Sequence, residues 1–220
     1  MTRPIVIVGL GGHGRVVAAA FAALGRHVIA ATVLCPKPSD PQFMGIETMT
    51  DEALCARYRP DEVFLSLGIG TTSPTNEHSA TRQMVKSFER LGYSFVGFQH
   101  PAAWVAFGAI ISATAQVHAG AIVQPGAIVG DFSILNTRAS VDHDCQIGAY
   151  CHIAPGATLS GNVSVGDGSH LGTGCCVIQG IRIGTSSFVA AGATVVRSVA
   201  NGDFVRGVPA KSFRPTHLTT

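Results

Sequence analysis

His143 is the residue best suited by type and surroundings to acid–base chemistry. It stands between two acids in the segment Val141-Asp142-His143-Asp144-Cys145. An imidazole titrates near neutral pH, so it can take a proton from a reacting group as a general base. Two alternatives stay open: a turn histidine without a role, and a histidine that only orients a nucleophile while water removes the proton.

The segment Gly9-Leu10-Gly11-Gly12-His13-Gly14 could also bind a ligand, because it fits the pattern GxGxxG. Backbone amides of such a loop, and of a helix that follows it, can hold a phosphate. NAD is not the expected ligand, since its ribose needs an acidic residue about twenty positions further on and Ala31–Cys35 contains none. We predict a diphosphate site, with a turn that needs glycine only for packing as the alternative.

The elements around this loop read as alternating strands and helices, which predicts a parallel, Rossmann-like α/β sheet. The expected strands are Ile5–Val8, Val28–Leu34, Val63–Leu67 and Phe95–Phe98, and the expected helices are Arg15–Leu24, Asp51–Tyr58 and Asn76–Leu91.

His143 belongs to a six-residue repeat that fills the second half of the chain. Every sixth residue from Val105 to Val195 is a branched aliphatic, and the residue four places later is almost always small. No helix or ordinary strand has this period, so we predict a parallel β-helix in which three hexapeptides close one triangular coil. Val105 to Thr194 then make five coils, with the aliphatic side chains inside. The sixteen aliphatic positions are Val105, Ile111, Val117, Val123, Val129, Leu135, Val141, Ile147, Ile153, Leu159, Val165, Leu171, Val177, Ile183, Val189 and Val195.

Stacking of such coils places residues eighteen apart above one another. His143, two places past interior Val141, should point outward from its turn and lie beneath Gly161, a glycine that leaves room for a substrate. His152 should lie beneath His170, for which we expect a solvated position, with Phe188 next. Three cysteines take the small interior position and are predicted to be core side chains rather than catalysts: Cys145, Cys151 and Cys175.

The composition is that of an ordered protein with much two-sided β structure. Hydrophobic residues make up 46% and charged residues 13% of the chain, and the net charge is +2 without any basic run, so nucleic acid is not an expected partner. Pro101–Gly130 lacks charged residues, but its six-residue period argues against a membrane span. The start of the sequence does not resemble a signal peptide. The six cysteines are therefore expected to be reduced thiols, and the expected location is the cytoplasm.

The repeat resembles the left-handed β-helix of hexapeptide acyltransferases. That resemblance implies a homotrimer with acetyl-CoA bound in the groove between neighbouring subunits. The segment Gly207-Val208-Pro209-Ala210-Lys211 is similar to the GxPAK segment that caps such helices.

Taken together, four features resemble bacterial nucleotide-sugar N-acetyltransferases: the glycine loop at Gly9–Gly14, the junction Phe98–Pro101, the pair Asn136-Thr137 and the motif around His143. The resemblance covers nearly the whole chain. It implies a nucleotide-sugar-binding domain at residues 1–100 and a left-handed β-helix acetyltransferase domain with a C-terminal cap at residues 101–220.

The resemblance also assigns site residues. His143 is the implied base, and the acid after it, Asp144, is implied to tune the imidazole. Bacillosamine-type enzymes carry Glu at this position. Because the side chain of Asp144 is shorter than that of Glu, Asp142 is a rival for this role. Gly11, Gly12, His13 and Gly14 are the implied contacts to the substrate's nucleotide, and Asn136 lies near the acceptor sugar. The implied acetyl-CoA contacts are His152, Gly161, Thr173 and Ala191.

The expected function is acetyl-CoA-dependent N-acetylation of a nucleotide-linked 4-amino-4,6-dideoxyhexose, such as GDP-perosamine or a UDP-4-amino sugar, for O-antigen lipopolysaccharide or another surface glycan. No metal is expected. Sialic-acid-type O-acetylation is the first alternative. A zinc carbonic anhydrase on the same fold is the second, although His143 and His152 lack the spacing of its ligands. A nucleotide-sugar sensor without catalysis is the third.

Overall fold

The structure, a computed structural model, describes residues 3–34, 45–70 and 77–213. The first of its two units lies within Met1–Gly70 and Ser79–Pro101, and the second includes Ala102–Thr220. Two residues of the predicted segments, Cys35 and Asn76, lie outside the described residues.

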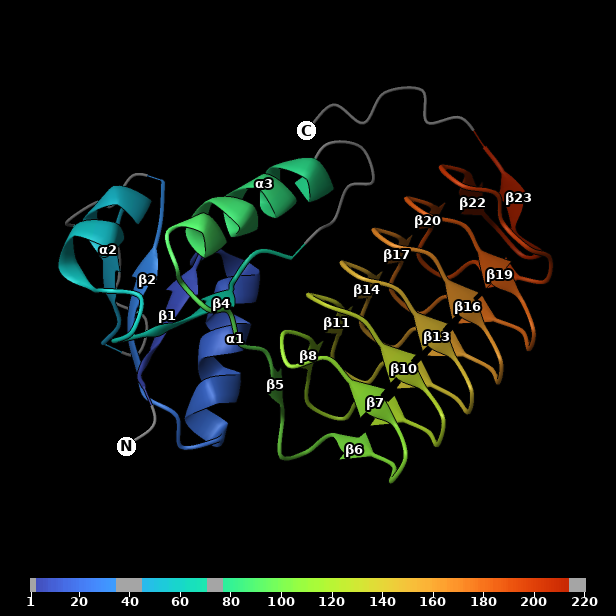
Figure 1. Cartoon of the computed structure of the whole chain (residues 1–220). Helices are drawn as coiled ribbons and strands as arrows, with labels where there is room; N and C mark the ends of the chain where they lie inside the picture. The colour runs from blue at the N-terminus through green and yellow to red at the C-terminus, as the bar shows by residue number, and fades with distance from the viewer. Residues whose placement is uncertain (1–2, 35–44, 71–76, 214–220) are drawn as a thin grey trace. The chain divides into compact units, whose positions relative to one another are not determined.

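The first unit is a parallel sheet with strand order β3-β2-β1-β4, as the alternation of elements predicted (Figure 1). Helix α1 packs Val17 and Phe21 against Ile5 and Ile7 of the sheet, and these four side chains are fully buried. The elements are β1 Ile5–Val8, α1 Gly12–Ala23, β2 Val28–Thr32, β3 Glu47–Met49, α2 Asp51–Arg57, β4 Phe64–Leu67 and α3 Glu77–Arg90.

Several predicted boundaries in this unit are wrong. Helix α1 begins at Gly12 rather than Arg15, because Gly11 serves as the N-cap and the glycines that follow adopt the helical conformation. The strand predicted at Phe95–Phe98 is not continuous. Phe95 makes one bridge to Leu65, and the chain then runs without strand structure to the short β5, Phe98–Gln99.

The second unit is the predicted left-handed β-helix, in which the strands of successive coils, from Trp104 to Val195, pair in parallel at a separation of eighteen residues (Figure 1). Its strands form three faces. Face 1 contains β6 Trp104–Val105, β9 Ile122–Val123, β12 Ser140–Val141, β15 Thr158–Leu159, β18 Cys176–Val177 and β21 Thr194–Val195. Face 2 contains β7 Ile110–Ile111, β10 Ile128–Val129, β13 Gln146–Ile147, β16 Ser164–Val165 and β19 Arg182–Ile183. Face 3 contains β8 Gln116–Val117, β11 Ile134–Leu135, β14 His152–Ile153, β17 His170–Leu171, β20 Phe188–Val189, β22 Phe204–Arg206 and the antiparallel β23 Lys211–Ser212.

The repeated aliphatic side chains form one continuous core inside the three faces. From Val117 onward all of them are buried, as predicted. The small position holds the three core cysteines, and burial raises the pKa of the Cys151 and Cys175 thiols to about 12. A thiol with such a pKa stays protonated at neutral pH, which supports a packing role.

A left-handed backbone conformation recurs at the turns of the coils, three residues after the aliphatic position. Glycine takes this conformation freely, and Gly126 has φ +75°. Asp144, one coil later at the same position, also has positive φ, at 58°. A left-handed conformation is uncommon for residues other than glycine, and aspartate is among the side chains that tolerate it best.

The C-terminal segment closes the last coil. The amide of Thr194 donates to the carbonyl of Gly207 at 3.0 Å, and the amide of Ala210 donates to the carbonyl of Thr194 at 2.7 Å. These two bonds pair the exposed edge of β21, so that the Gly207–Lys211 segment covers the end of face 1.

Candidate active site

His143 lies in the turn that leads from β12 on face 1 to β13 on face 2, and its side chain is 61% exposed. Its ring Nδ1 is 2.9 Å from Oδ2 of Asp144. Its backbone amide donates to Oδ1 of Asp142 at 2.7 Å. The two acids therefore have different parts: Asp144 contacts the imidazole, while Asp142 holds the backbone of the turn.

The environment of His143 favours the protonated imidazole. The hydrogen bond to Asp144 raises the pKa of His143 above its ordinary value, and the charges of Asp142 and Asp144 add to the increase, against a smaller lowering by burial. With Nδ1 donating to the carboxylate, Nε2 of the neutral ring is left as the acceptor for a proton. An imidazole held in this way is a stronger base than an isolated one.

The Asp144 carboxylate lies against Gly126 of the coil below, and a backbone hydrogen bond joins the two coils there. A Cβ added at Gly126, eighteen residues earlier, would collide with the carboxylate of Asp144, and the amide of Asp144 donates to the carbonyl of Pro125 at 3.1 Å. The left-handed backbone of Asp144 turns its carboxylate back toward the preceding ring.

Gly161 stacks over His143, as the eighteen-residue spacing predicted. The space above the glycine was expected to admit a substrate, but the ring of His143 occupies it. A Cβ at Gly161 would lie 2.9 Å from Cδ2 of His143 and closer still to Nε2. The imidazole itself, rather than an empty volume, therefore takes the place of the missing side chain. The carbonyl of His143 accepts a 2.8 Å hydrogen bond from the amide of Asn162, which fixes the two coils together.

Two further predicted site residues, Asn136 and His152, contact each other. Nδ2 of Asn136 is 3.0 Å from Nε2 of His152, and Oδ1 of Asn136 accepts from the amide of Thr137 at 2.7 Å. Since Oδ1 is the acceptor, Nδ2 donates to Nε2, and this bond fits an imidazole with its proton on Nδ1. The sequence analysis did not predict this contact. The available signal was the separation of sixteen residues, because residues about eighteen apart lie on neighbouring coils.

Rings continue upward from His152 along face 3. His170 meets His152 edge to face at a centroid distance of 4.9 Å and stacks on Phe188 at 5.2 Å. The predicted order of this ladder is confirmed by the strand register. The predicted solvated position of His170 is wrong: the residue is only 7% exposed, because neighbouring rings cover its faces.

The remaining predicted contacts do not gather around His143 within one chain. Thr173 and Ala191, like Asn136, lie in turns between face 3 and face 1, whereas His143 and Gly161 lie between face 1 and face 2. The width of face 1 separates the two groups. Within one protomer the predicted contacts thus form two separate groups.

In the first unit, the loop after β1 contains two kinds of glycine: some are required by the backbone conformation or by packing, and others are not. Gly9 has φ +93°, and a Cβ at Gly14 would strike the carbonyl of Gly9, so both are required by the fold. Around Gly11 and Gly12 nothing lies within 4 Å of an added Cβ. Within the described residues, the fold therefore does not demand glycine at these two positions. The fifth loop residue, His13, packs its ring against Gly70.

A cleft of about 170 Å³ opens beside this loop, at the carboxyl ends of β1 and β2. Ligands of open parallel sheets bind at this edge. The amide of Gly9 donates to the hydroxyl of Thr32 at 3.3 Å, which ties the loop to the cleft. The cleft is lined by Val8, Gly9, Thr32, Val33, Leu34, Thr50, Asp51, Glu52, Ile69 and Met84.

Neither a metal cluster nor a membrane helix occurs in the part of the chain that the structure describes. Within residues 3–34, 45–70 and 77–213 no three His, Cys, Asp or Glu side chains gather as ligands could. None of the helices described there has the length and apolar character that crossing a membrane needs.

Solved structures of high similarity exist for nearly the whole chain. The acetyltransferase domain of PglB from Neisseria gonorrhoeae in complex with acetyl coenzyme A is 34% identical, with a TM-score of 0.87 over 97% of this chain and 100% of that one. PerB from Caulobacter crescentus, in complex with CoA and GDP-perosamine, is 33% identical, with a TM-score of 0.85 over 96% of this chain and 97% of that one.

Other comparisons are weaker. WeeI from Acinetobacter baumannii, at 23% identity and a TM-score of 0.75 over 96% of this chain and 100% of that one, shares the fold. No protein-family model matches the sequence. The search of curated proteins also found no match.

Proposed function

This chain belongs to the hexapeptide-repeat family of nucleotide-sugar N-acetyltransferases, and from that membership we propose that it transfers the acetyl group of acetyl-CoA to the amine of a nucleotide-linked amino sugar. The observation that carries the proposal is the His143–Asp144 pair, an exposed imidazole with a carboxylate on Nδ1 and Nε2 left for a proton. The membership favours N-acetylation over the O-acetylation, carbonic anhydrase and sensor alternatives.

The proposed acceptor is a 4-amino-4,6-dideoxyhexose carried by GDP or UDP, used for O-antigen or another surface glycan. One relative was solved with GDP-perosamine, a sugar of this type. In this chain the cleft beside Gly9 and the open positions Gly11 and Gly12 are the proposed nucleotide site, with His13 and Gly14 shaping the loop. The proposed location is the cytoplasm.

In the proposed reaction, Nε2 of His143 removes a proton from the sugar amine as its nitrogen attacks the thioester carbonyl. The C–N bond forms as the C–S bond breaks, and the thiolate takes the proton from the His143 imidazolium, so that CoA leaves as a thiol and the imidazole returns to its neutral form. Asp144 stabilises the imidazolium that forms, because its carboxylate accepts the hydrogen bond from Nδ1. Asn136 is the proposed contact to the sugar, and His152, Gly161, Thr173 and Ala191 are the proposed contacts to acetyl-CoA.

A homotrimer is the proposed assembly, because it would join the two groups of predicted contacts that one protomer keeps apart. The turn with His143 in one copy would then face the turn with Thr173 in the next. Exposed apolar side chains near the start of the β-helix are available for such an interface, and exposed patches of this kind mark protein–protein contacts. They are Trp104 at 53%, Phe107 at 102%, Ile110 at 62%, Ile122 at 39% and Ile128 at 41% exposure.

The test is to offer acetyl-CoA with a panel of GDP-, UDP- and dTDP-linked 4-amino sugars and to follow thiol release. Matched sugars with a hydroxyl in place of the amine serve as controls for O-acetylation. We expect turnover with at least one amino sugar and none with its hydroxyl counterpart. Thiol release with no member of the panel would remove the proposal.

A further inference from the structure

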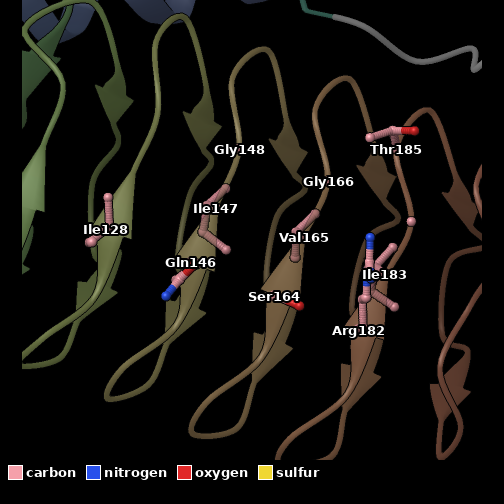
Figure 2. Close-up of a pocket in the computed structure, with 11 residues that line it drawn as sticks. Ile128, Gln146, Ile147, Gly148, Ser164, Val165, Gly166, Arg182, Ile183 and Thr185 are labelled. Carbon is pink, nitrogen blue, oxygen red and sulfur yellow. The ribbon is translucent and has the colours of Figure 1, made fainter.

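The turns that lead from face 3 to face 1 of the β-helix form a column in which one residue departs from the pattern. Residues eighteen apart occupy equivalent places in successive coils. Figure 2 shows this stacking on face 2, where Gln146, Ser164 and Arg182 line a groove from successive rungs. In the column of turns, the third residue after each interior aliphatic of face 3 has a positive φ. In the described coils these residues are Gly120, Arg138, Gly156, Gly174 and Gly192.

Arg138 is the exception in this column. Its φ is 58°, a left-handed conformation that glycine adopts freely but that is costly for a residue with a long side chain. Because the equivalent turns use glycine, the turn itself gives no reason for an arginine. Residues held in such conformations cluster at active sites and ligand contacts. The side chain of Arg138 is therefore the part of this turn that needs an explanation.

The stem of the Arg138 side chain lies over Gly120 of the coil below. A Cβ added at Gly120 would be 3.2 Å from Cγ of Arg138, whereas nothing lies within 4 Å of a Cβ added at the three later glycines of the column. The side chain thus extends toward the start of the β-helix. Arg138 is exposed, and within residues 3–34, 45–70 and 77–213 its guanidinium takes part in no ion pair or side-chain hydrogen bond.

Arg138 lies next to the proposed contact to the acceptor sugar and points away from the proposed contacts to acetyl-CoA. It follows Asn136 by two residues, a span of at most about 7 Å. Thr173 and Ala191, which are proposed for acetyl-CoA, follow Thr137 by 36 and 54 residues. They therefore lie two and three coils above it, roughly 10 and 15 Å along the β-helix. Since Arg138 extends downward, an anion at its guanidinium would belong to the acceptor rather than to CoA.

We propose that Arg138 binds the phosphate group that is bonded to the amino sugar, and that it thereby selects acceptors that carry this phosphate. The inference rests on the proposed function, because it assumes that the acceptor sugar lies at Asn136. A guanidinium presents fixed N–H donors that match phosphate oxygens, and such charged hydrogen bonds are stronger than neutral ones. In a nucleoside diphosphate sugar the group in question is the β-phosphate. GDP and UDP contain it, and GMP and UMP lack it.

Calorimetric titration of the full chain with these four nucleotides tests the inference. Arg138→Gly restores the residue of the neighbouring coils, and Arg138→Lys keeps a positive charge. Arg90→Ala is the control, because Arg90 is an exposed cation at the end of α3. Arg138→Gly should raise the dissociation constant of the preferred nucleoside diphosphate roughly 10- to 100-fold and leave that of its monophosphate unchanged. Arg138→Lys should recover part of the affinity, and Arg90→Ala should match the wild type.

Steady-state thiol release gives the second arm of this experiment. Arg138→Gly should raise the KM for the nucleotide-linked amino sugar by a similar factor, while kcat and the KM for acetyl-CoA stay at their wild-type values. A contact to a phosphate that does not react stabilises the ground state and the transition state alike, so its loss changes KM rather than kcat. Thermal unfolding of Arg138→Gly should stay close to that of the wild type, because glycine fits this turn.

Equal diphosphate affinity in the wild type and Arg138→Gly, or a wild type that binds neither GDP nor UDP, would overturn the inference even if the enzyme turns over its amino sugar. A rise in the KM for acetyl-CoA alone would also overturn it, because the phosphate at Arg138 would then be that of CoA. Absence of thiol release with every acceptor, while diphosphate binding still depends on Arg138, would instead overturn the proposed function alone.

Discussion

The imidazole of His143 occupies the volume that any side chain at position 161 would need. An added Cβ at Gly161 would lie about 2.5 Å from Cε1 of the ring, well inside van der Waals contact. Gly161 has no positive φ, so its backbone would accept alanine without strain. The glycine is thus explained by the ring it accommodates.

Gly161→Ala should therefore damage catalysis and spare stability. The added methyl must push the exposed ring aside, and a misplacement of about 1 Å can lower turnover roughly 100-fold. Thiol release and thermal unfolding, measured on the same preparation, check this. Wild-type turnover in Gly161→Ala would show that the position of the ring does not matter.

His143→Asn should lower kcat by roughly 100-fold or more, which is the usual contribution of a general base. Asparagine keeps a polar side chain of similar reach but cannot take up a proton. The measurement is steady-state thiol release at saturating acetyl-CoA and acceptor. A residual rate that stays close to the wild type would support the view that His143 only orients the amine while water removes the proton.

Asp144→Asn should move the pH dependence of kcat/KM toward acid. Activity needs the neutral imidazole, and the hydrogen bond from His143 to Asp144 raises the pKa of His143, so the wild-type rate falls while pH drops through that raised value. Without the carboxylate the pKa returns toward its ordinary value, and the acid limb of the profile shifts to lower pH. The plateau rate should drop roughly tenfold with the loss of a charged hydrogen bond.

Asparagine is the right replacement here because it also tolerates the left-handed φ of 58° that Asp144 adopts. Asp142→Asn is the matched control: Asp142 holds the backbone amide rather than the ring, so its variant should leave the plateau rate close to the wild type. An acid limb that stays in place or moves to higher pH in Asp144→Asn would contradict the assignment.

The sequence predicts the β-helix well because a single physical rule, burial of a branched aliphatic at every sixth residue, repeats without interruption. The stacking of Gly161 over His143 and of His170 over His152 follows from the same rule by counting. These predictions needed no knowledge of side-chain conformation.

The contact between Asp144 and His143 could not be predicted in this way. Arm length alone made the contact doubtful, but the left-handed backbone at Asp144 directs its carboxylate toward the ring. The burial of His170 also escaped prediction, since it depends on how rings from separate coils cover one another rather than on the pattern of a strand.

Gly12→Ala and Gly14→Ala should have opposite effects in the nucleotide loop. At Gly12 an added methyl meets nothing within 4 Å, so the variant should be at least as stable as the wild type but bind GDP or UDP roughly tenfold more weakly. At Gly14 the methyl strikes the carbonyl of Gly9, so unfolding should become easier by about 1–3 kcal/mol. Thermal unfolding and nucleotide titration measure both effects. Unchanged nucleotide affinity in Gly12→Ala would place the diphosphate elsewhere.

Phe107→Asp should break the proposed trimer and remove activity together with it. Phe107 is completely exposed in the single chain and lies two coils below His143 at the same turn, so an interface that completes the site should bury it. A buried, unpaired carboxylate opposes association strongly. Sedimentation should then give the mass of one chain, circular dichroism should keep the β signal, and thiol release should fall to background.

Leu91→Asp is the control, because Leu91 is 58% exposed in the other unit and its variant should keep the mass and the rate of the wild type. A Phe107→Asp protein that sediments as a trimer, or a monomer that retains full turnover, would refute the shared site.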